Sequence, residues 1–198
     1  MYGKLVASAM VALSLFGAGA AAAAAAQPAA NAAAPAQQLA GANLAVNEAH
    51  GDWSVRCFQI QSIAPCDILQ LANNQDTNQR VLLVSIAFIP SRNSYFMQVI
   101  VPLGVALARG ITLAAGENTL TGVKYSRCER DGCYVEVALP EPTVASLSSM
   151  TENTTITIIP YGQGDPITLP LSVNGFSEAI GRMQAQARQR ATNPPPNP

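Results

Sequence analysis

The residues best suited to chemistry in this 198-residue chain are its four cysteines, which stand in two local pairs. Eight residues separate Cys57 from Cys66, and four separate Cys128 from Cys133 in the stretch CERDGC. Paired cysteines in proteins hold zinc, carry out dithiol redox chemistry or form structural disulfides. The choice among these depends on the other ligands that the chain offers and on the compartment in which it folds.

Zinc and redox chemistry fit these cysteines less well than disulfides do. A structural zinc site needs four Cys, His or carboxylate ligands at compact spacings, but the first pair is wide and the single histidine, His50, lies at the edge of the domain. A dithiol centre usually uses C-x-x-C at the start of a helix, whereas Asp131-Gly132 is a turn dipeptide between two predicted strands. A redox role for the second pair stays an alternative, since a strained hairpin disulfide is reducible. We expect no metal and no cofactor.

The N-terminus indicates a compartment in which disulfides form. Residues 1–4 contain one lysine, residues 5–20 are apolar and uncharged, and an alanine run with A-x-A sequences near 24–26 follows. This pattern predicts a secretory signal peptide over residues 1–26. A membrane anchor is the alternative, because the apolar run and the alanines together reach about 20 residues. In both cases the remaining chain would lie outside the cytoplasm, in the periplasm, the outer envelope or the medium, where disulfides persist.

Four cysteines allow three disulfide connectivities, and sequence alone does not decide among them. The short separation within each pair favours the bridges Cys57–Cys66 and Cys128–Cys133. Such bridges would reinforce a domain that is already long enough to bury a core of its own.

The hydrophobic pattern around CERDGC bears on the geometry of the second bridge. A regular ladder with the two cysteines face to face would set apolar residues opposite polar ones on one face of the hairpin. A shift of one residue pairs Tyr125 with Val135 and Val123 with Val137, which the hydrophobic pattern favours. A bulge near the turn, with Gly132 in a left-handed conformation, would accommodate both this register and the disulfide.

Composition divides the chain into four parts. After the predicted signal peptide, residues 27–50 are rich in Ala, Pro, Gln and Asn and lack aromatic residues, so we expect a disordered linker. Residues 51–190 form a single disulfide-stapled domain of ordinary size. Residues 191–198, which contain NPPPNP, are predicted to be a disordered tail.

Many short apolar runs alternate with turn signals inside the domain, which predicts a mainly β fold, an antiparallel sandwich or barrel-like domain. The first strand is expected to contain a bulge or to end near Cys57. Two stretches, VPLGVAL and LPLSVNG, both place Pro-Leu-small-Val at a strand end, either by chance or because half of the domain is duplicated. The expected strands cover residues 51–60, 66–72, 81–89, 95–105, 111–113, 120–128, 133–140, 154–162 and 166–173.

Two helices are expected beside these strands. A short one near 141–150 would have Pro142 in its first turn, where the missing N–H has no intrahelical partner in any case. A longer one near 175–190, capped by Asn174 or Ser177, would cover an edge or an end of the β-structure.

Other function classes find little support in the chain. The net charge is −1, charged residues make up 12% of the chain, and no basic stripe is interleaved with aromatic residues, so nucleic acid is not an expected partner. No catalytic triad, Walker or dinucleotide motif occurs, so we expect a protein that is not an enzyme. Two carboxylates of the domain could still meet as a hydrolase pair. The arginines at 182, 188 and 190 either complement the dipole of the second helix or make a weak contact with an anionic surface.

Four stretches taken together resemble the invasion-associated locus B family. They are GDWSVRC (Gly51–Cys57), VPLGVALARGITL (Val101–Leu113), CERDGC followed by VEVALP, and LPLSVNGFSEAI (Leu169–Ile180). The resemblance covers residues 51–183 and implies an exported, cysteine-containing, mainly β protein of α-proteobacterial type. It carries no known catalytic centre and no agreed ligand. Because the family is named for a member linked to red-cell invasion, a link to host-cell invasion is implied as well.

We therefore expect an exported envelope or periplasmic protein that acts as a non-catalytic binding or interaction module. Its partner would be an unidentified envelope or host protein or another ligand, and the membrane would be involved only through export or peripheral association. Function on a β scaffold usually resides in its loops, and the candidate contact loops are 73–79, 90–95 and 161–165. The alternatives are an envelope structural or stress assembly factor and a carboxylate-based envelope hydrolase.

Overall fold

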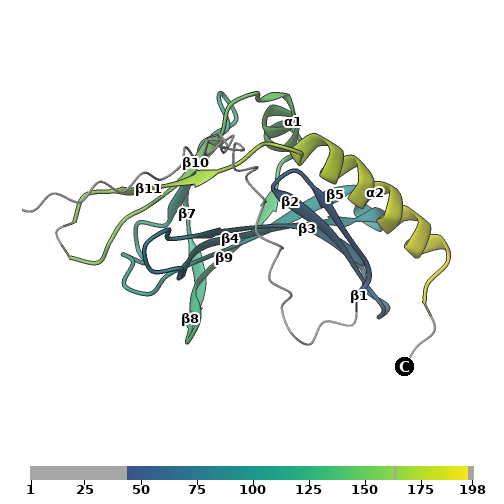
Figure 1. Cartoon of the computed structure of the whole chain (residues 1–198), viewed down its shortest axis with the longest axis horizontal. Coiled ribbons are helices and arrows are strands. Elements are labelled where there is room, and N and C mark those ends of the chain that lie inside the picture. The colour runs from purple at the N-terminus through teal and green to yellow at the C-terminus, as the bar shows by residue number, and fades with distance from the viewer. Residues whose placement is uncertain (1–43, 163, 196–198) are drawn as a thin grey trace, which may run out of the picture. The chain divides into compact units, whose positions relative to one another are not determined.

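The computed structural model describes residues 44–162 and 164–195, which form two β-sheets and two α-helices (Figure 1). The strands of the larger sheet are β1 (Leu44–His50), β2 (Trp53–Phe58), β3 (Cys66–Asn73), β4 (Arg80–Ile89), β5 (Ser94–Val101), β8 (Tyr125–Glu129) and β9 (Gly132–Leu139). Those of the smaller sheet are β6 (Ile111–Leu113), β7 (Leu120–Val123), β10 (Thr154–Ile158) and β11 (Ile167–Leu171). The helices are α1 (Glu141–Ser149) and α2 (Phe176–Thr192), and a 3₁₀ turn, η1 (Pro90–Arg92), joins β4 to β5.

Both sheets are antiparallel throughout. The larger one has the order β1-β2-β3-β4-β5-β9-β8, and the smaller one has the order β11-β10-β6-β7. Most neighbours in the larger sheet are consecutive in the chain, as in a meander, and β9 joins β5 only after the chain has visited the smaller sheet. The predicted mainly β, antiparallel fold is therefore confirmed.

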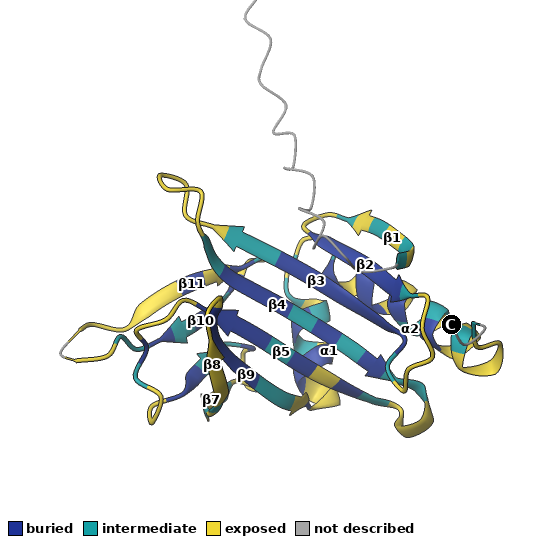
Figure 2. Ribbon diagram, turned by 90° about the horizontal axis from the view of Figure 1, so that it is seen from below, coloured by how far each residue is buried: buried dark blue, intermediate teal, exposed yellow. Residues whose placement is uncertain are grey.

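One hydrophobic core joins the larger sheet to α1, α2 and the smaller sheet, which supply buried residues to the same cluster. Alternate residues of β4 over 82–88 are buried in it, and Trp53 of β2 packs edge-on against Phe176 of α2 with ring centroids 5.1 Å apart. Figure 2 shows the opposite face of the larger sheet, with the helices behind it. That face carries its own small cluster of buried side chains, formed by Leu69, Leu83, Ile100 and Tyr134.

Strand β1 shows that the predicted linker extended too far. Residues 44–50, assigned to the linker by composition, pair with β2, and Leu44 faces Phe58 at one end of the ladder. Alternate side chains of β1 are half-buried, but only two of these four, Leu44 and Val46, are apolar, so the composition of the stretch resembles that of a linker. The rest of that linker and the predicted signal peptide lie outside the described residues. Of the bulge or strand end predicted near Cys57, the structure has the end, since β2 stops at Phe58. The bulge of this ladder lies in β1, between Leu44 and Val46.

The strand predicted over residues 120–128 is two strands in two sheets. The first half, β7, pairs with β6 of the smaller sheet, and the second half, β8, pairs with β9 of the larger sheet. Gly122 has a φ of +63°, and Lys124 Nζ donates a hydrogen bond of 2.6 Å to a carbonyl of the loop before β6. Alternation of apolar residues cannot report this change of sheet, because both halves keep the period of a strand.

The CERDGC hairpin keeps part of its predicted register. Tyr125 faces Val135 as predicted, whereas Val123 belongs to β7 and pairs with Ile111 of the smaller sheet. A bulge is present, but it falls between Tyr125 and Arg127 and not in the turn. The disulfide and the favoured apolar pair are thus compatible because one extra residue is accommodated within β8.

Gly132 occupies a position that a side chain would not fit. Its φ is +147°, and a Cβ there would lie 2.3 Å from the Val101 carbonyl oxygen and 2.9 Å from Ile100 Cγ2. The predicted positive φ is present, but the reason differs from the prediction. The hairpin lies directly against the end of β5, and this contact requires glycine.

Both predicted helices are present, with differences at their ends. Pro142 lies in the first turn of α1 as predicted. The N-cap of α2 is Gly175, with a φ of +78°, and no side chain caps the helix, so the predicted caps Asn174 and Ser177 are wrong. Because α2 runs to Thr192, the predicted tail begins later than residue 191. Within the described part of the chain, no helix combines the length and the hydrophobicity needed to cross a membrane.

The start of α2 is anchored to the β1–β2 turn by direct backbone contact. A Cβ on Gly175 would lie 2.1 Å from the His50 carbonyl oxygen, and a Cβ on Gly51 would lie 2.5 Å from that of Asn174. The Asp52 N–H donates a hydrogen bond of 3.1 Å to the Asn174 carbonyl across this contact. Two glycines are therefore needed for the turn and the helix to meet.

Ser172 ties the same segment to the larger sheet. Its carbonyl accepts hydrogen bonds from Trp53 Nε1 at 2.9 Å and from Gln70 Nε2 at 3.1 Å. Its N–H donates to Gln70 Oε1 at 2.9 Å, and its hydroxyl donates to Asp52 Oδ2 at 2.6 Å. The stretches GDW and SVNG, far apart in the sequence, thus meet at one junction that positions α2.

We predict that Gly175→Ala lowers the free energy of unfolding by about 2–5 kcal/mol, because it adds left-handed strain to a clash with the His50 carbonyl. Gly181→Ala in the same helix is the matched control, since Gly181 is exposed and no atom lies within 4 Å of the point that the added methyl group would occupy. This change should stabilise the protein by about 0.5–1 kcal/mol through helix propensity. Urea denaturation measures both, and equal stability of the two variants would contradict the role of the junction.

Candidate functional site

The structure joins all four cysteines in two cross-strand disulfides. Cys57 of β2 faces Cys66 of β3, and Cys128 of β8 faces Cys133 of β9. Over residues 44–162 and 164–195, no group of three or more His, Cys, Asp or Glu side chains is placed to hold a metal ion. In this structure the cysteines tie neighbouring strands together.

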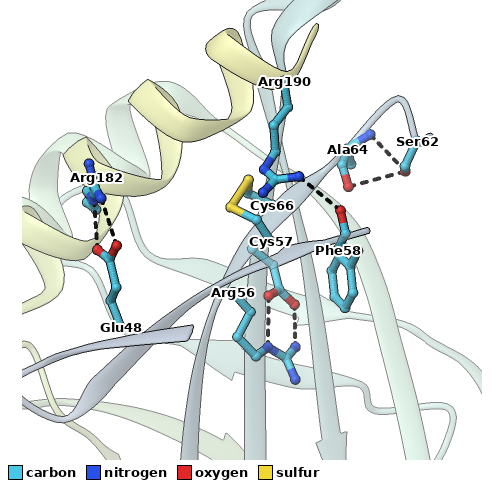
Figure 3. The surroundings of a disulfide bond; sticks show 10 residues. Glu48, Arg56, Cys57, Phe58, Ser62, Ala64, Cys66, Arg182 and Arg190 are labelled. Atoms are coloured by element: carbon cyan, nitrogen blue, oxygen red, sulfur yellow. Dashed lines mark hydrogen bonds and ion pairs between the residues drawn. A yellow bond between two sulfur atoms is a disulfide. The ribbon is translucent and has the colours of Figure 1, made fainter. Parts of the chain in front are cut away.

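The first disulfide lies beside a buried ion pair on the opposite face of the same two strands (Figure 3). Arg56 Nε donates a hydrogen bond of 2.9 Å to Asp67 Oδ1, and Arg56 Nη2 bonds Asp67 Oδ2. Ser85 of β4 donates a third hydrogen bond of 2.8 Å to this carboxylate. The two charged side chains are only 10% and 9% exposed. Because both carboxylate oxygens are occupied, this pair has the geometry of a structural tie across three strands, not of a catalytic acid or base.

The second disulfide closes a hairpin in which Arg127 pairs with two carboxylates. Arg127 bonds Glu129 at 2.6 Å and Glu136 at 2.7 Å, and its guanidinium lies 4.1 Å from the centroid of the Tyr134 ring. The Tyr134 hydroxyl donates a hydrogen bond of 2.7 Å to Asp131 Oδ2. This bond lowers the pKa of Asp131 and raises the pKa of Tyr134 to about 12, while hydrogen bonding from Arg127 lowers the pKa of Glu136.

These pairings do not fit the alternative of a carboxylate-based hydrolase. Such an enzyme needs a carboxyl of raised pKa to donate a proton at a cleft. The pKa values of Asp131 and Glu136 are lowered, and so is that of Glu48, which accepts two hydrogen bonds from Arg182. Of the two main hollows on the surface of the described residues, neither is lined by a carboxylate.

An apolar cleft opens between the two sheets, at the end of the larger sheet where β4 begins and β5 ends. Its volume is about 160 Å³. It is lined by Val81, by residues 102–105, and by Ile158, Pro160, Ile167 and Leu169 of the smaller sheet and its loop. No charged residue lines it, so the cleft is suited to an apolar group.

Backbone pairing holds the cleft-lining segment in place. Val105 forms an antiparallel bridge with Pro160, just after β10. The Tyr161 N–H donates a hydrogen bond of 2.7 Å to the Gly104 carbonyl beside this bridge. The chain therefore leaves β5, crosses to the smaller sheet and forms one wall of the cleft with an ordered backbone.

The two similar stretches seen in the sequence meet at this cleft. VPLGVAL supplies residues 102–105, and LPLSVNG supplies Leu169. Their settings differ, because the first stretch leaves β5 for a loop whereas the second lies in β11 and leads into α2. Both stretches contribute apolar residues to the lining of the cleft.

Exposed apolar side chains gather around the mouth of the cleft. Leu103 and Ile167 line it and are 56% and 45% exposed, and Tyr161 in the adjoining loop is 83% exposed. Leu107, on the segment that continues from residue 105, is 52% exposed. Exposed apolar side chains beside an apolar cleft commonly mark a site of interaction.

The edge of the smaller sheet beside the cleft is closed to another strand. β11 is an edge strand, and its Pro170 stands opposite Thr155 of β10. Since the Thr155 carbonyl accepts a bond from Ala114 on the other side, Pro170 directs its backbone away from β10, toward solvent. Pro170, and Pro166 just before the strand, have no N–H to offer there. The two prolines therefore oppose extension of the smaller sheet at this edge by another strand.

Two of the three predicted contact loops, 73–79 and 90–95, lie at opposite ends of the larger sheet (Figure 2), and the third, 161–165, follows β10 of the smaller sheet. Of the loop 161–165, Tyr161 adjoins the cleft, and residue 163 is outside the described residues. Loop 73–79 joins β3 to β4 at that same end, whereas loop 90–95 joins β4 to β5 at the other. Sequence reasoning missed residues 102–105, although the Pro-Leu-small-Val pattern that two stretches share was a usable signal.

Comparisons with known proteins identify relatives of this domain. Residues 53–184 match the family model described as Invasion associated locus B protein. The chain is 27% identical over 150 residues to a protein of Brucella abortus strain 2308 named Invasion protein B homolog, covering 76% of this chain and 86% of that protein. The homolog from Brucella abortus biovar 1 strain 9-941 gives the same values.

A solved structure shares the fold. The crystal structure of invasion associated protein b from Bartonella henselae superimposes with a TM-score of 0.62 at 24% sequence identity. The match covers 71% of this chain and 97% of that one.

We predict that the two disulfides differ in their resistance to reduction. Cys57 and Cys66 are fully buried and Cys133 is 2% exposed, whereas Cys128 lies on an exposed edge strand. A reductant must reach a sulfur atom to break the bond, so Cys128–Cys133 should open first in the folded protein. Stepwise treatment with a phosphine reductant, followed by alkylation and peptide mapping, measures the order. Simultaneous opening, or earlier loss of Cys57–Cys66, would show that accessibility does not control reduction here.

Proposed function

This chain belongs to the invasion-associated locus B family, and on that premise we propose that it is an exported, non-catalytic binding protein of the bacterial envelope. Its contact site is the apolar cleft between the two sheets, and its partner is a protein that inserts a large apolar side chain there.

Two features of the chain support export. Residues 1–26 have the composition of a secretory signal peptide. The four cysteines of the domain are all engaged in disulfides, which persist outside the cytoplasm.

The relatives' names support a role in contact with other cells. The Brucella abortus relatives are named invasion protein B homologs, and the Bartonella henselae structure is that of an invasion associated protein. The partner is accordingly a protein of the host-cell surface or of the bacterium's own envelope.

The gathering of exposed apolar side chains around the cleft is the observation that carries the proposal. A volume of about 160 Å³ is close to that of an engineered cavity that binds benzene, so it suits one aromatic or branched side chain. Binding energy in protein interfaces concentrates on such anchors in apolar pockets. Leu103 and Tyr161 would pack around the anchor and exclude water from it.

We predict that Leu103→Ser and Tyr161→Ser each reduce partner capture by about tenfold or more, as expected for residues at the centre of an interface. The exported chain would carry a photo-crosslinking residue at Ile167, on the cleft wall. It would be exposed to membrane proteins of the producing bacterium and, separately, of host cells, and crosslinked peptides would be quantified by mass spectrometry.

Phe96→Ser supplies the matched control for this experiment. Phe96 is 40% exposed, but it lies on the open face of the larger sheet, away from the cleft. The control should retain capture and should have the melting temperature of the other variants. Loss of capture in Phe96→Ser alone, or equal capture by all variants, would contradict the assignment of the cleft. A captured envelope protein would indicate a role in assembly, and a captured host protein a role in invasion.

A further inference from the structure

The end of the larger sheet opposite the cleft brings together three segments of the chain. β2 ends there and β3 begins, so the loop over residues 58–66 projects from it, and η1 joins β4 to β5 beside that loop. The last turn of α2 and residues 194–195 reach the same place, since Gln61 Nε2 donates a hydrogen bond of 3.2 Å to the Pro195 carbonyl. We call these segments, residues 58–66, 90–93 and 188–195, the basic end.

Two isoleucines project from the basic end on a braced loop. Ile63 is 70% exposed and Ile60 is 52% exposed, and both line a hollow of about 340 Å³ together with Arg190 and the prolines of the C-terminal segment. The Cys57–Cys66 disulfide closes this loop, and a hydrogen bond of 3.0 Å from the Phe58 N–H to the Pro65 carbonyl narrows its base. The exposed isoleucines are thus presented by a constrained loop and not by a free tail.

Three arginines of the basic end have no ion-pair partner among the described residues, and one of them, Arg190, lines the same hollow as the isoleucines. Arg92 belongs to η1, and Arg188 and Arg190 belong to the last turns of α2. Among the described residues none of the three forms an ion pair. Arg182, one turn or more away on α2, differs from them because it is paired with Glu48 at 2.7 Å. The basic end therefore carries uncompensated positive charge on a chain whose net charge is −1.

The arginines also hold the segments of the basic end together. Arg188 Nη2 donates a hydrogen bond of 2.9 Å to Asn93 Oδ1, and its guanidinium lies 4.9 Å from the centroid of the Phe88 ring. Arg190 Nη1 donates a hydrogen bond of 3.2 Å to the Phe58 carbonyl. The dipole of α2 favours cations at its C-terminus, but it does not account for Arg92, which lies outside that helix.

We propose that the basic end docks onto an anionic phospholipid membrane surface. Exposed isoleucines enter the boundary between head groups and acyl chains, while arginines beside them bind the lipid phosphates. The start of β1 lies at this end as well, because Leu44 faces Phe58. Docking in this way leaves the cleft free, since the cleft and the basic end share no residue.

Vesicle binding by the chain recovered from the exported fraction tests this inference. Vesicles of phosphatidylglycerol and phosphatidylcholine in equal parts are compared with vesicles of phosphatidylcholine alone, and bound protein is measured by co-sedimentation. Binding should require phosphatidylglycerol and weaken as salt is added. Arg92→Gln should lower the partition coefficient about fivefold, as expected for the loss of one cation near an anionic surface. Ile63→Ser should lower it about tenfold or more, because an apolar side chain no longer leaves water.

Two matched variants at the cleft end serve as controls. Ile167→Ser removes an isoleucine that is 45% exposed, and Arg109→Gln removes an exposed arginine without an ion pair in the described chain. Both should bind anionic vesicles like the unmodified chain, and circular dichroism should show that all four variants are folded. Absence of vesicle binding, equal binding to neutral vesicles, or equal losses at both ends of the domain would overturn the proposal. The proposal would also be overturned if the chain did not bind vesicles but captured a protein through Ile63. None of these outcomes bears on the cleft, which is tested separately by partner capture.

Discussion

The placement of α2 depends on one contact, in which Gly51 and Gly175 bring the β1–β2 turn and the start of the helix together backbone to backbone. With the helix start fixed there, Phe176 packs onto Trp53 and the buried side of α2 closes the core over the first strands of the larger sheet. Ser172 reinforces this arrangement because its backbone is bonded to two residues of the sheet. The same placement carries the other end of the helix to the loop closed by the first disulfide, where Arg190 meets Phe58. The basic end is therefore a consequence of a contact made at the opposite end of α2.

The larger sheet separates two surfaces of different chemistry along its strands. At one end the chain leaves β5, crosses to the smaller sheet and forms an uncharged cleft with exposed leucine, isoleucine and tyrosine around it. The other end carries two exposed isoleucines together with arginines that form no ion pair in the described chain. Because strands are extended and stiff, residues at the two ends of β4 are held roughly 30 Å apart. A domain built in this way can rest on a charged surface with one end while the other end remains accessible to a protein partner.

The CERDGC hairpin has its place in this arrangement as a support. Among the described residues, Arg127 pairs with two carboxylates of the hairpin and Asp131 pairs with Arg80 of β4, which ties the hairpin to itself and to the sheet. Its Gly132 lies against the Val101 carbonyl at the end of β5, immediately before the segment 102–105 that lines the cleft. The disulfide thus holds the hairpin at the point where the chain turns from the larger sheet into the cleft wall. A metal site or a redox centre was an alternative for these two cysteines. In the structure they form a disulfide that links β8 to β9.

Local pattern by itself determined the elements of this protein and part of their pairing. Apolar alternation marked most of the strands, the 3.6-residue period marked both helices, and the pairing of Tyr125 with Val135 followed from which side chains can share a face. The change of sheet at Lys124, the N-cap at Gly175 and the strand hidden in residues 44–50 were decided by tertiary contacts. Alternation of apolar residues does not indicate which sheet a strand joins. The contact of Gly175 with His50 joins residues that are distant in sequence, so the residues next to Gly175 in the sequence do not predict it. The cleft and the basic end were decided in the same way, since each combines residues from segments that are distant in sequence and meet only because the core forces their strands together.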